Sequence, residues 1–211
     1  MELGYLSSAS ILVPVILGLF CFKNLFKEQK YFFYYIILSL VFEIIADVFS
    51  CYHINSHGLF KLMLITDVVF FIWFYHKLGI SANWLKVFSI AIVGFILAFI
   101  VLKYILYVHV LFDSLFYLLI FLFFIIQSAM TIIQIFENTD LNPTSNFIFW
   151  IAFARLMYFL IIFVIYVYPT LQSVGYDKKS FWLVFNTINA IGNILGNILY
   201  GVSFLCRKTN N

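Results

Sequence analysis

The stretch "LVFEIIADVFSC", residues 40–51, places two carboxylates inside a segment that is otherwise almost entirely apolar. It belongs to a hydrophobic run over residues 31–53, and about 20 such residues in an α-helix are enough to cross a bilayer. Glu43 and Asp47 are four residues apart and therefore lie on one face of that helix. Because a charged side chain facing lipid is costly, this face is predicted to point into the protein interior.

The composition of the whole chain agrees with a membrane protein. Of its 211 residues, 65% are hydrophobic and 10% are charged, and the mean hydropathy is +1.08, far from the balance of a soluble domain. The net charge of +3 is spread along the chain, so no nucleic-acid binding is expected. The three cysteines are far apart in the sequence and predict neither a disulfide framework nor a metal motif.

Apolar runs long enough to span a bilayer occur seven times, which predicts a single all-α domain over residues 1–211, a polytopic bundle of seven transmembrane helices. Few polar residues mark the boundary between the fourth and the fifth run, so a bundle of six helices is the alternative. The predicted spans are 6–24, 31–53, 59–78, 83–106, 109–136, 147–169 and 181–206.

The basic residues near the ends of these runs predict the orientation, since cytoplasmic loops are enriched in lysine and arginine. Four lie on one side: Lys61, Lys103, Lys178 and Lys179. Seven lie on the other: Lys23, Lys27, Lys30, Lys77, Lys86, Arg207 and Lys208. The protein is therefore expected in a bacterial inner membrane, with its N-terminus outside as an uncleaved anchor and its C-terminus in the cytoplasm.

Two further ionisable residues lie deep inside predicted spans: Asp67 in the third and Arg155 in the sixth. A lone guanidinium at mid-membrane needs a partner, and it can bind a carboxylate with two hydrogen bonds. From the estimated depths, Arg155 is predicted to pair with Glu43. Asp67 is the alternative partner, should the third span rather than the second border the sixth.

The last predicted span carries a stripe of amides at helical spacing, and the fifth adds Gln127. Gly192 and Gly196 form a small-xxx-small pair beside the stripe, which favours close approach of another helix. The stripe consists of Asn186, Asn189, Asn193, Asn197 and Tyr200.

Three interpretations of this polar cluster stay open: hydrogen bonds that only hold the bundle together, a ligand pocket or polar pathway, and catalysis. A retinal protein is excluded because the last span has no lysine, and intramembrane zinc hydrolases of the ceramidase and adiponectin-receptor type carry a histidine pair there that this chain lacks. A metal site at the outer end is a weak alternative, since ordinary solvated histidines explain the same residues. Its candidate ligands are His53, His57, His109 and Asp113.

The layout resembles a widespread group of small seven-helix membrane proteins of Bacteroidetes, and the likeness covers most of the chain. It rests on Glu43 and Asp67, on "FWIAFARLMYF" (149–159) and on "INAIGNILGNILYG" (188–201). Arg155 stands where that group is expected to have a small or apolar residue, which indicates a specialised member. In size, topology and general character the chain is also similar to the membrane accessory proteins encoded beside the RNA-guided RNA nuclease of type VI-B CRISPR loci.

These observations predict a non-enzymatic accessory, sensor or pore-type membrane protein with the buried polar cluster as its working part. The resemblance implies a role in antiviral defence. No cofactor and no catalytic residue are expected; the bilayer is the expected partner, together with a second copy of the chain or a protein encoded nearby. The alternatives are a lipid-modifying intramembrane hydrolase and a small-solute transporter.

Overall fold

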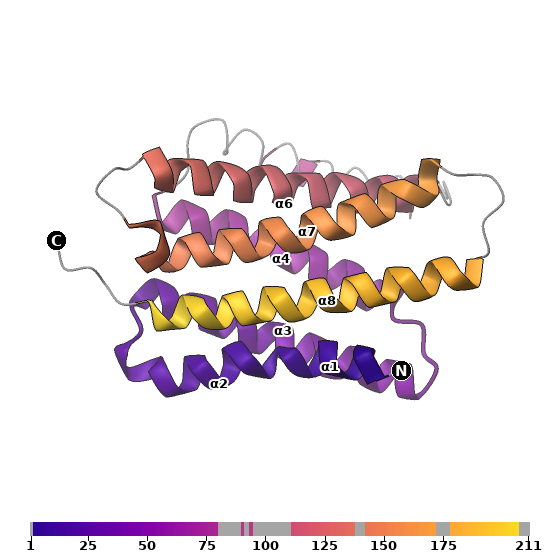
Figure 1. The fold of residues 1–211 in the computed structure, drawn as a ribbon, viewed down its shortest axis with the longest axis horizontal. Coiled ribbons are helices and arrows are strands. Elements are labelled where there is room, and N and C mark those ends of the chain that lie inside the picture. Colours follow the sequence, from indigo (N-terminus) through magenta and orange to yellow (C-terminus); the bar gives the residue numbers. More distant parts are fainter. Residues whose placement is uncertain are drawn as a thin grey trace.

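A computed structural model describes residues 2–79, 90, 93–94, 111–137, 142–171 and 178–206, and within these ranges the chain forms helices and no strands. The long helices lie side by side as one bundle (Figure 1). In chain order the elements are α1 (Glu2–Ser10), α2 (Leu12–Cys21), the 3-10 helix η1 (Phe22–Asn24), α3 (Lys27–Cys51), α4 (His57–Lys77), α6 (Leu111–Glu137), the 3-10 helix η2 (Pro143–Ser145), α7 (Phe147–Leu171) and α8 (Lys178–Leu205).

Six segments of the described chain are helical, long and apolar enough to cross a membrane: Leu3–Asn24, Lys27–Cys51, Gly58–Lys77, Phe116–Glu137, Phe147–Val164 and Asn186–Leu205. They correspond to six of the seven predicted spans. The remaining one, 83–106, lies outside the described residues except for residues 90, 93 and 94.

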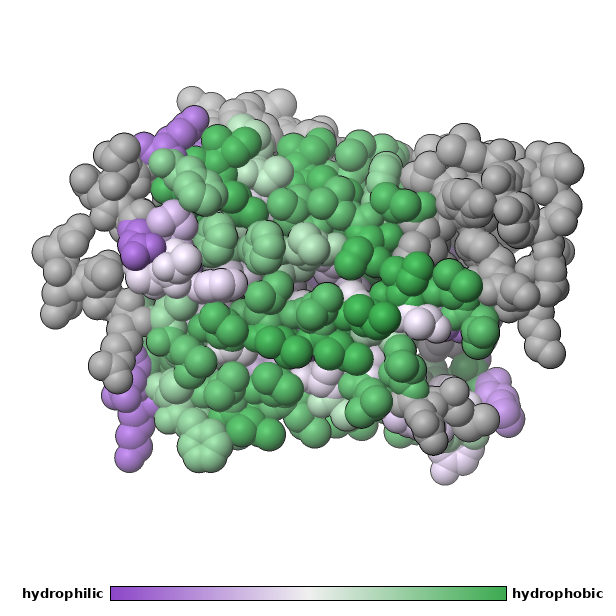
Figure 2. Space-filling view, in the orientation of Figure 1, coloured by the Kyte–Doolittle hydropathy of each residue, from purple (hydrophilic) through white to green (hydrophobic). Residues whose placement is uncertain are grey.

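The outer surface of the bundle is apolar. Figure 2 shows hydrophobic side chains over the middle of the molecule and hydrophilic ones towards its two ends. Large apolar side chains such as Phe20 and Leu183 are 84% and 71% exposed. Exposure of this extent and distribution fits a protein whose surrounding solvent is lipid.

The first span is interrupted at Ile11, which separates α1 from α2. Pro14 lies in the first turn of α2. Because proline has no amide hydrogen to donate and its ring clashes with the carbonyl one turn earlier, α1 cannot continue unbroken into α2. The Ser10 hydroxyl donates to the carbonyl oxygen of Ser7 at 2.6 Å, a local bond at the end of α1. Hydropathy predicted one helix over 6–24, and the proline is the physical reason for the break.

The last helix, α8, is central to the packing. It lies against α7 on one side and against α1 and α2 on the other, while α7 also packs on α6, and α3 on α4. Two hydrophobic clusters fill the bundle, one containing Leu64, Phe121 and Phe159 and the other built around Phe32 and Phe204.

Helices α4 and α6 run in the same direction, although they follow one another in the described chain (Figure 1). The rings of Phe60 and Tyr117 lie 5.9 Å apart, and further along both helices those of Phe71 and Phe124 lie 6.4 Å apart. Lys77 at the end of α4 and Leu111 at the start of α6 therefore lie at opposite ends of the bundle.

The two ends of the bundle can be told apart by the elements that begin and end there. We call one the lysine end: α2 ends there, α3 begins there and α4 ends there, and its lysines are Lys23, Lys27, Lys30 and Lys77. We call the other the open end: it contains the start of α1 and the connection 52–56 between α3 and α4. In Figure 1 the end of α8 lies at the lysine end and the start of α1 at the open end.

Glycines bring helices together at three places, one of which is Gly201 of α8, where an added Cβ would lie 2.8 Å from Leu17 of α2. Gly192 and Gly196 face α7, where an added Cβ would lie 3.5 Å from Ile161 and 4.0 Å from the Cβ of Tyr158. A tighter approach, which was not predicted, occurs at Gly18 of α2, whose added Cβ would fall on the ring of Phe33. The absence of a side chain is therefore required at Gly18 more strictly than at the predicted pair.

Candidate functional site

Arg155, in the third turn of α7, is the most unusual buried residue of the bundle, with 1% of its surface exposed. Its guanidinium carbon lies 3.3 Å from the centre of the Phe71 ring and 4.2 Å from that of Phe124. Its Nη1 donates to Oε1 of Gln127 at 3.2 Å. A delocalised, weakly hydrated guanidinium stacks well on aromatic faces, so two rings and one amide replace much of its water.

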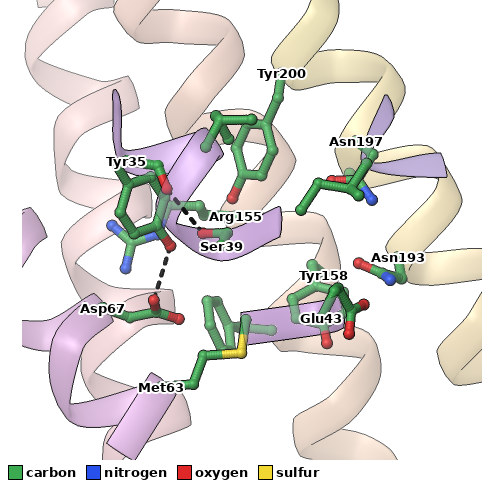
Figure 3. Close-up of a pocket in the computed structure, with 14 residues that line it drawn as sticks. Tyr35, Ser39, Glu43, Met63, Asp67, Arg155, Tyr158, Asn193, Asn197 and Tyr200 are labelled. Atoms are coloured by element: carbon green, nitrogen blue, oxygen red, sulfur yellow. Dashed lines mark hydrogen bonds between the residues drawn. The ribbon is translucent and has the colours of Figure 1, made fainter. Parts of the chain in front are cut away.

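The acid on which Arg155 acts electrostatically is Asp67 of α4. Asp67 is 8% exposed and accepts a hydrogen bond of 2.8 Å from the hydroxyl of Tyr35 on α3. Figure 3 shows this bond and the Arg155 side chain close by. The described residues place no carboxylate in direct contact with the guanidinium, whose Nη2 has no hydrogen-bond partner among them. Arg155 and Asp67 are thus electrostatically coupled without direct contact.

Glu43 lies elsewhere, and the predicted pair between Arg155 and Glu43 is absent from the structure. Glu43 interacts with Asp47 and with the side chain of Asn193 on α8, whereas the guanidinium of Arg155 is held by groups of α4 and α6. The estimated depths of the two residues were similar and both line the inner cavity, but their side chains have different partners. Depth alone therefore could not identify the partner.

Asp47, one turn beyond Glu43 towards the open end, is exposed and accepts a hydrogen bond of 3.4 Å from Ser8 of α1. Both acids were predicted to face inward, towards Arg155 and the asparagine stripe. Glu43 does meet the stripe, at Asn193 (Figure 3). Asp47 lies at the edge of the asparagine stripe.

The asparagine stripe of α8 packs against the first helix. Asn193 Nδ2 donates to Oγ of Ser7 at 3.0 Å, and Asn197 Nδ2 donates to Oγ of Ser10 at 2.7 Å. Asn186 is exposed near the start of α8, and the Oδ1 of Asn189 is buried without a hydrogen-bond partner among the described residues. The stripe thus both joins two helices and lines a polar interior.

Several members of the site were not predicted. Ser7 and Ser10, three residues apart, are as periodic as the asparagines they bond, and this spacing was a usable signal. Tyr35 and Tyr158 had no such signal, because 14 tyrosines are distributed through an aromatic-rich chain without a pattern. Gln127 was predicted; Tyr200, also predicted, lies with its ring 5.2 Å from that of Phe32.

Two cavities meet at this cluster. The inner cavity has a volume of about 80 Å³, and its polar lining includes Asp67, Arg155, Asn197 and Tyr200. The outer cavity, which we call the vestibule, has a volume of about 460 Å³ and reaches Ser56 in the α3–α4 connection. Four residues line both cavities, which makes them neighbours: Glu43, Met63, Tyr158 and Asn193.

An aromatic layer lies between the inner cavity and the lysine end. Phe32 is at its centre, with ring centroids 6.0 Å from Phe74 and 5.7 Å from Phe204, and all three are at most 2% exposed. Each of these three phenylalanines is closer to the lysine end than a residue of the same helix that lines the inner cavity. Together the two cavities and the layer form a polar pocket that enters from the open end and stops at packed rings.

Of the four candidate metal ligands, the described chain includes the side chain of His53 alone. There, no group of three or more histidine, cysteine, aspartate or glutamate side chains could hold a metal ion. His53 has φ 55° and follows the end of α3. Its amide donates to the carbonyl oxygen of Ser50, and the amide of Ile54 donates to that of Phe49. This is the geometry of a Schellman motif. His109 lies outside the described residues, as do the side chains of His57 and Asp113.

No protein-family model, curated protein or solved structure matches this chain.

Proposed function

We propose that this protein is a non-enzymatic, multi-pass membrane sensor that receives a small ligand in the polar pocket and passes the binding event to a partner protein. The observation that carries the proposal is the shape of the pocket. It enters from the open end, narrows from about 460 Å³ to about 80 Å³, and is followed by the rings of Phe32, Phe74 and Phe204. A dead-end pocket suits binding better than passage.

The helices around the pocket provide a route for a signal. Ser7 and Ser10 of α1 are bonded to α8 through Asn193 and Asn197, and α1 is separated from α2 by the break at Ile11. A ligand in the vestibule touches α1, α3, α4, α7 and α8 at once. It therefore stabilises whichever arrangement of α1 on α8 gives it the better contacts, which is the requirement for a ligand to shift a conformational equilibrium.

The cellular setting belongs to the same proposal. Lys23, Lys27, Lys30 and Lys77 all lie at the lysine end, so we place this end in the cytoplasm of a bacterium and the vestibule on the outer side of its inner membrane. The resemblance to membrane accessory proteins of type VI-B CRISPR loci suggests antiviral defence as the process. A partner encoded nearby would then read the state of the sensor.

The test separates a sensor from a pore or transporter. Protein reconstituted into liposomes filled with KCl should leave a K⁺ diffusion potential no larger than that of empty liposomes, as measured with a voltage-sensitive dye. Valinomycin added at the end shows that the vesicles are sealed. A K⁺ current that needs the protein would overturn the proposal in favour of a pore. Stoichiometric zinc in the purified protein would favour the hydrolase.

A further inference from the structure

The vestibule is chemically one-sided. Among the described residues that line it, Glu43 is the one charged group, and neither lysine nor arginine contributes to the lining. Lys61 follows the lining residue Phe60 on α4, but its side chain is directed to α6: its Nζ lies 6.0 Å from the centre of the Tyr117 ring. Asp47, one turn from Glu43, adds a second carboxylate beside α1.

The rest of the lining supplies hydrogen-bond acceptors and aromatic faces. The Oδ1 of Asn189 is buried and has no hydrogen-bond partner within the described part of the chain, and it belongs to a residue of the vestibule wall. Rings are contributed by Phe42, Phe60 and Tyr158. A carboxylate, a free carbonyl oxygen and aromatic rings are the groups that favour a cation carried on an apolar body.

We infer that the vestibule binds a small organic cation, an amine with an apolar or aromatic body, whose ammonium group lies between Glu43 and Asn189. This inference rests on the proposed sensor function and gives its ligand a chemical class. The charge balance supports it. Arg155, the buried cation of the cluster, contacts Phe71 and Gln127, so the described residues give Glu43 no positive partner of its own.

The volume fits as well. A cavity of about 460 Å³ lies within the range of about 300–1,000 Å³ that is usual for sites of drug-sized ligands. It is far larger than a site for a bare metal ion, which coordinating oxygens surround at about 2–3 Å. The inner cavity, at about 80 Å³, has room for a few water molecules or the end of the ligand.

The test compares two probes of nearly equal size and shape, 2-phenylethylammonium and 2-phenylethanol, by calorimetric titration of the purified full chain in detergent. The charged probe should bind and the alcohol should bind at least about tenfold more weakly. Glu43→Gln should remove most of that difference. Glu28→Gln is the matched control, because it makes the same change in the same helix at the lysine end, and it should bind both probes like the wild type.

A second measurement needs no variant. A hydrophobic carbodiimide modifies carboxyl groups buried in membranes, and mass spectrometry can locate the adduct on Glu43. The amine should protect Glu43 from this modification, whereas the alcohol should not. Equal binding of the two probes, unchanged discrimination in Glu43→Gln, or no protection by the amine would overturn the inference. The K⁺ measurement is independent of these results, so failure of the ligand class and failure of the sensor proposal are distinguishable.

Discussion

At the scale of single residues, Arg155 shows how a full charge is kept inside the bundle. The guanidinium stacks on Phe71 and Phe124 and donates to Gln127, while Asp67 lines the same inner cavity without direct contact. Lysine could not replace it, because an ammonium group has no planar face and is more strongly hydrated.

The electrostatic coupling of Arg155 and Asp67 predicts a specific pattern in double-mutant cycles. Arg155→Met and Asp67→Asn should each destabilise the detergent-solubilised protein, and the double variant should lose about 1–3 kcal/mol less than the sum of the two. The cycle of Arg155→Met with Glu43→Gln is the control and should be additive within about 0.5 kcal/mol. Equal coupling in both cycles, measured by chemical unfolding, would show that the Asp67 assignment is wrong.

Gly18 predicts a second outcome at this scale. Its added Cβ would overlap the Phe33 ring, which is 4% exposed and fixed by rings of Phe22 and Phe204 at 5.5 and 5.8 Å. Gly18→Ala should therefore cost roughly 1–3 kcal/mol of stability.

Gly196→Ala is the matched change, because the nearest atom to its added Cβ lies 4.0 Å away. Here the better helix propensity of alanine should raise stability by up to about 1 kcal/mol. Both variants can be compared by thermal unfolding in the same detergent. A loss of stability at Gly196 as large as that at Gly18 would contradict the packing described for α7 and α8.

At the scale of elements, hydropathy predicted the helices well and their neighbours poorly. Six spans were predicted nearly to their ends, because the bilayer fixes the length of an apolar helix. The asparagine face of α8 was predicted from its spacing. Its partners Ser7 and Ser10 were not, since periodicity within one helix does not say which other helix borders it. For the same reason, Glu43 rather than Asp67 was predicted as the partner of Arg155.

The parallel course of α4 and α6 predicts the span that the described residues leave open. Lys77 lies at the lysine end and Leu111 at the open end, so the chain between them must cross the membrane an odd number of times. One apolar run in this interval, 83–106, is long enough to do so. Single cysteines at Gly79 and at His109, in a background with the native cysteines replaced by serine, should react with an impermeant thiol reagent from opposite sides. Reaction from one side would support six spans.

At the scale of the whole molecule, the bundle separates a lysine end from an open end, and the polar pocket leads towards the open end. Its wall is formed by five helices, including the short α1 that is bonded to α8. A buried polar cluster could be predicted from the sequence, but not that this cluster borders a cavity, because cavities arise from side chains of helices far apart in the chain.

The side from which the pocket can be reached is the most direct test of a pocket closed by Phe32, Phe74 and Phe204. In the cysteine-free background, Asn189→Cys in the vestibule and Lys27→Cys at the lysine end are each treated with an impermeant thiol reagent, first in spheroplasts and then in inverted vesicles. We expect Asn189→Cys to react in one preparation and Lys27→Cys in the other, whichever way the protein is oriented. Reaction of Asn189→Cys in both preparations would mean a continuous path through the bundle and would contradict the closed pocket.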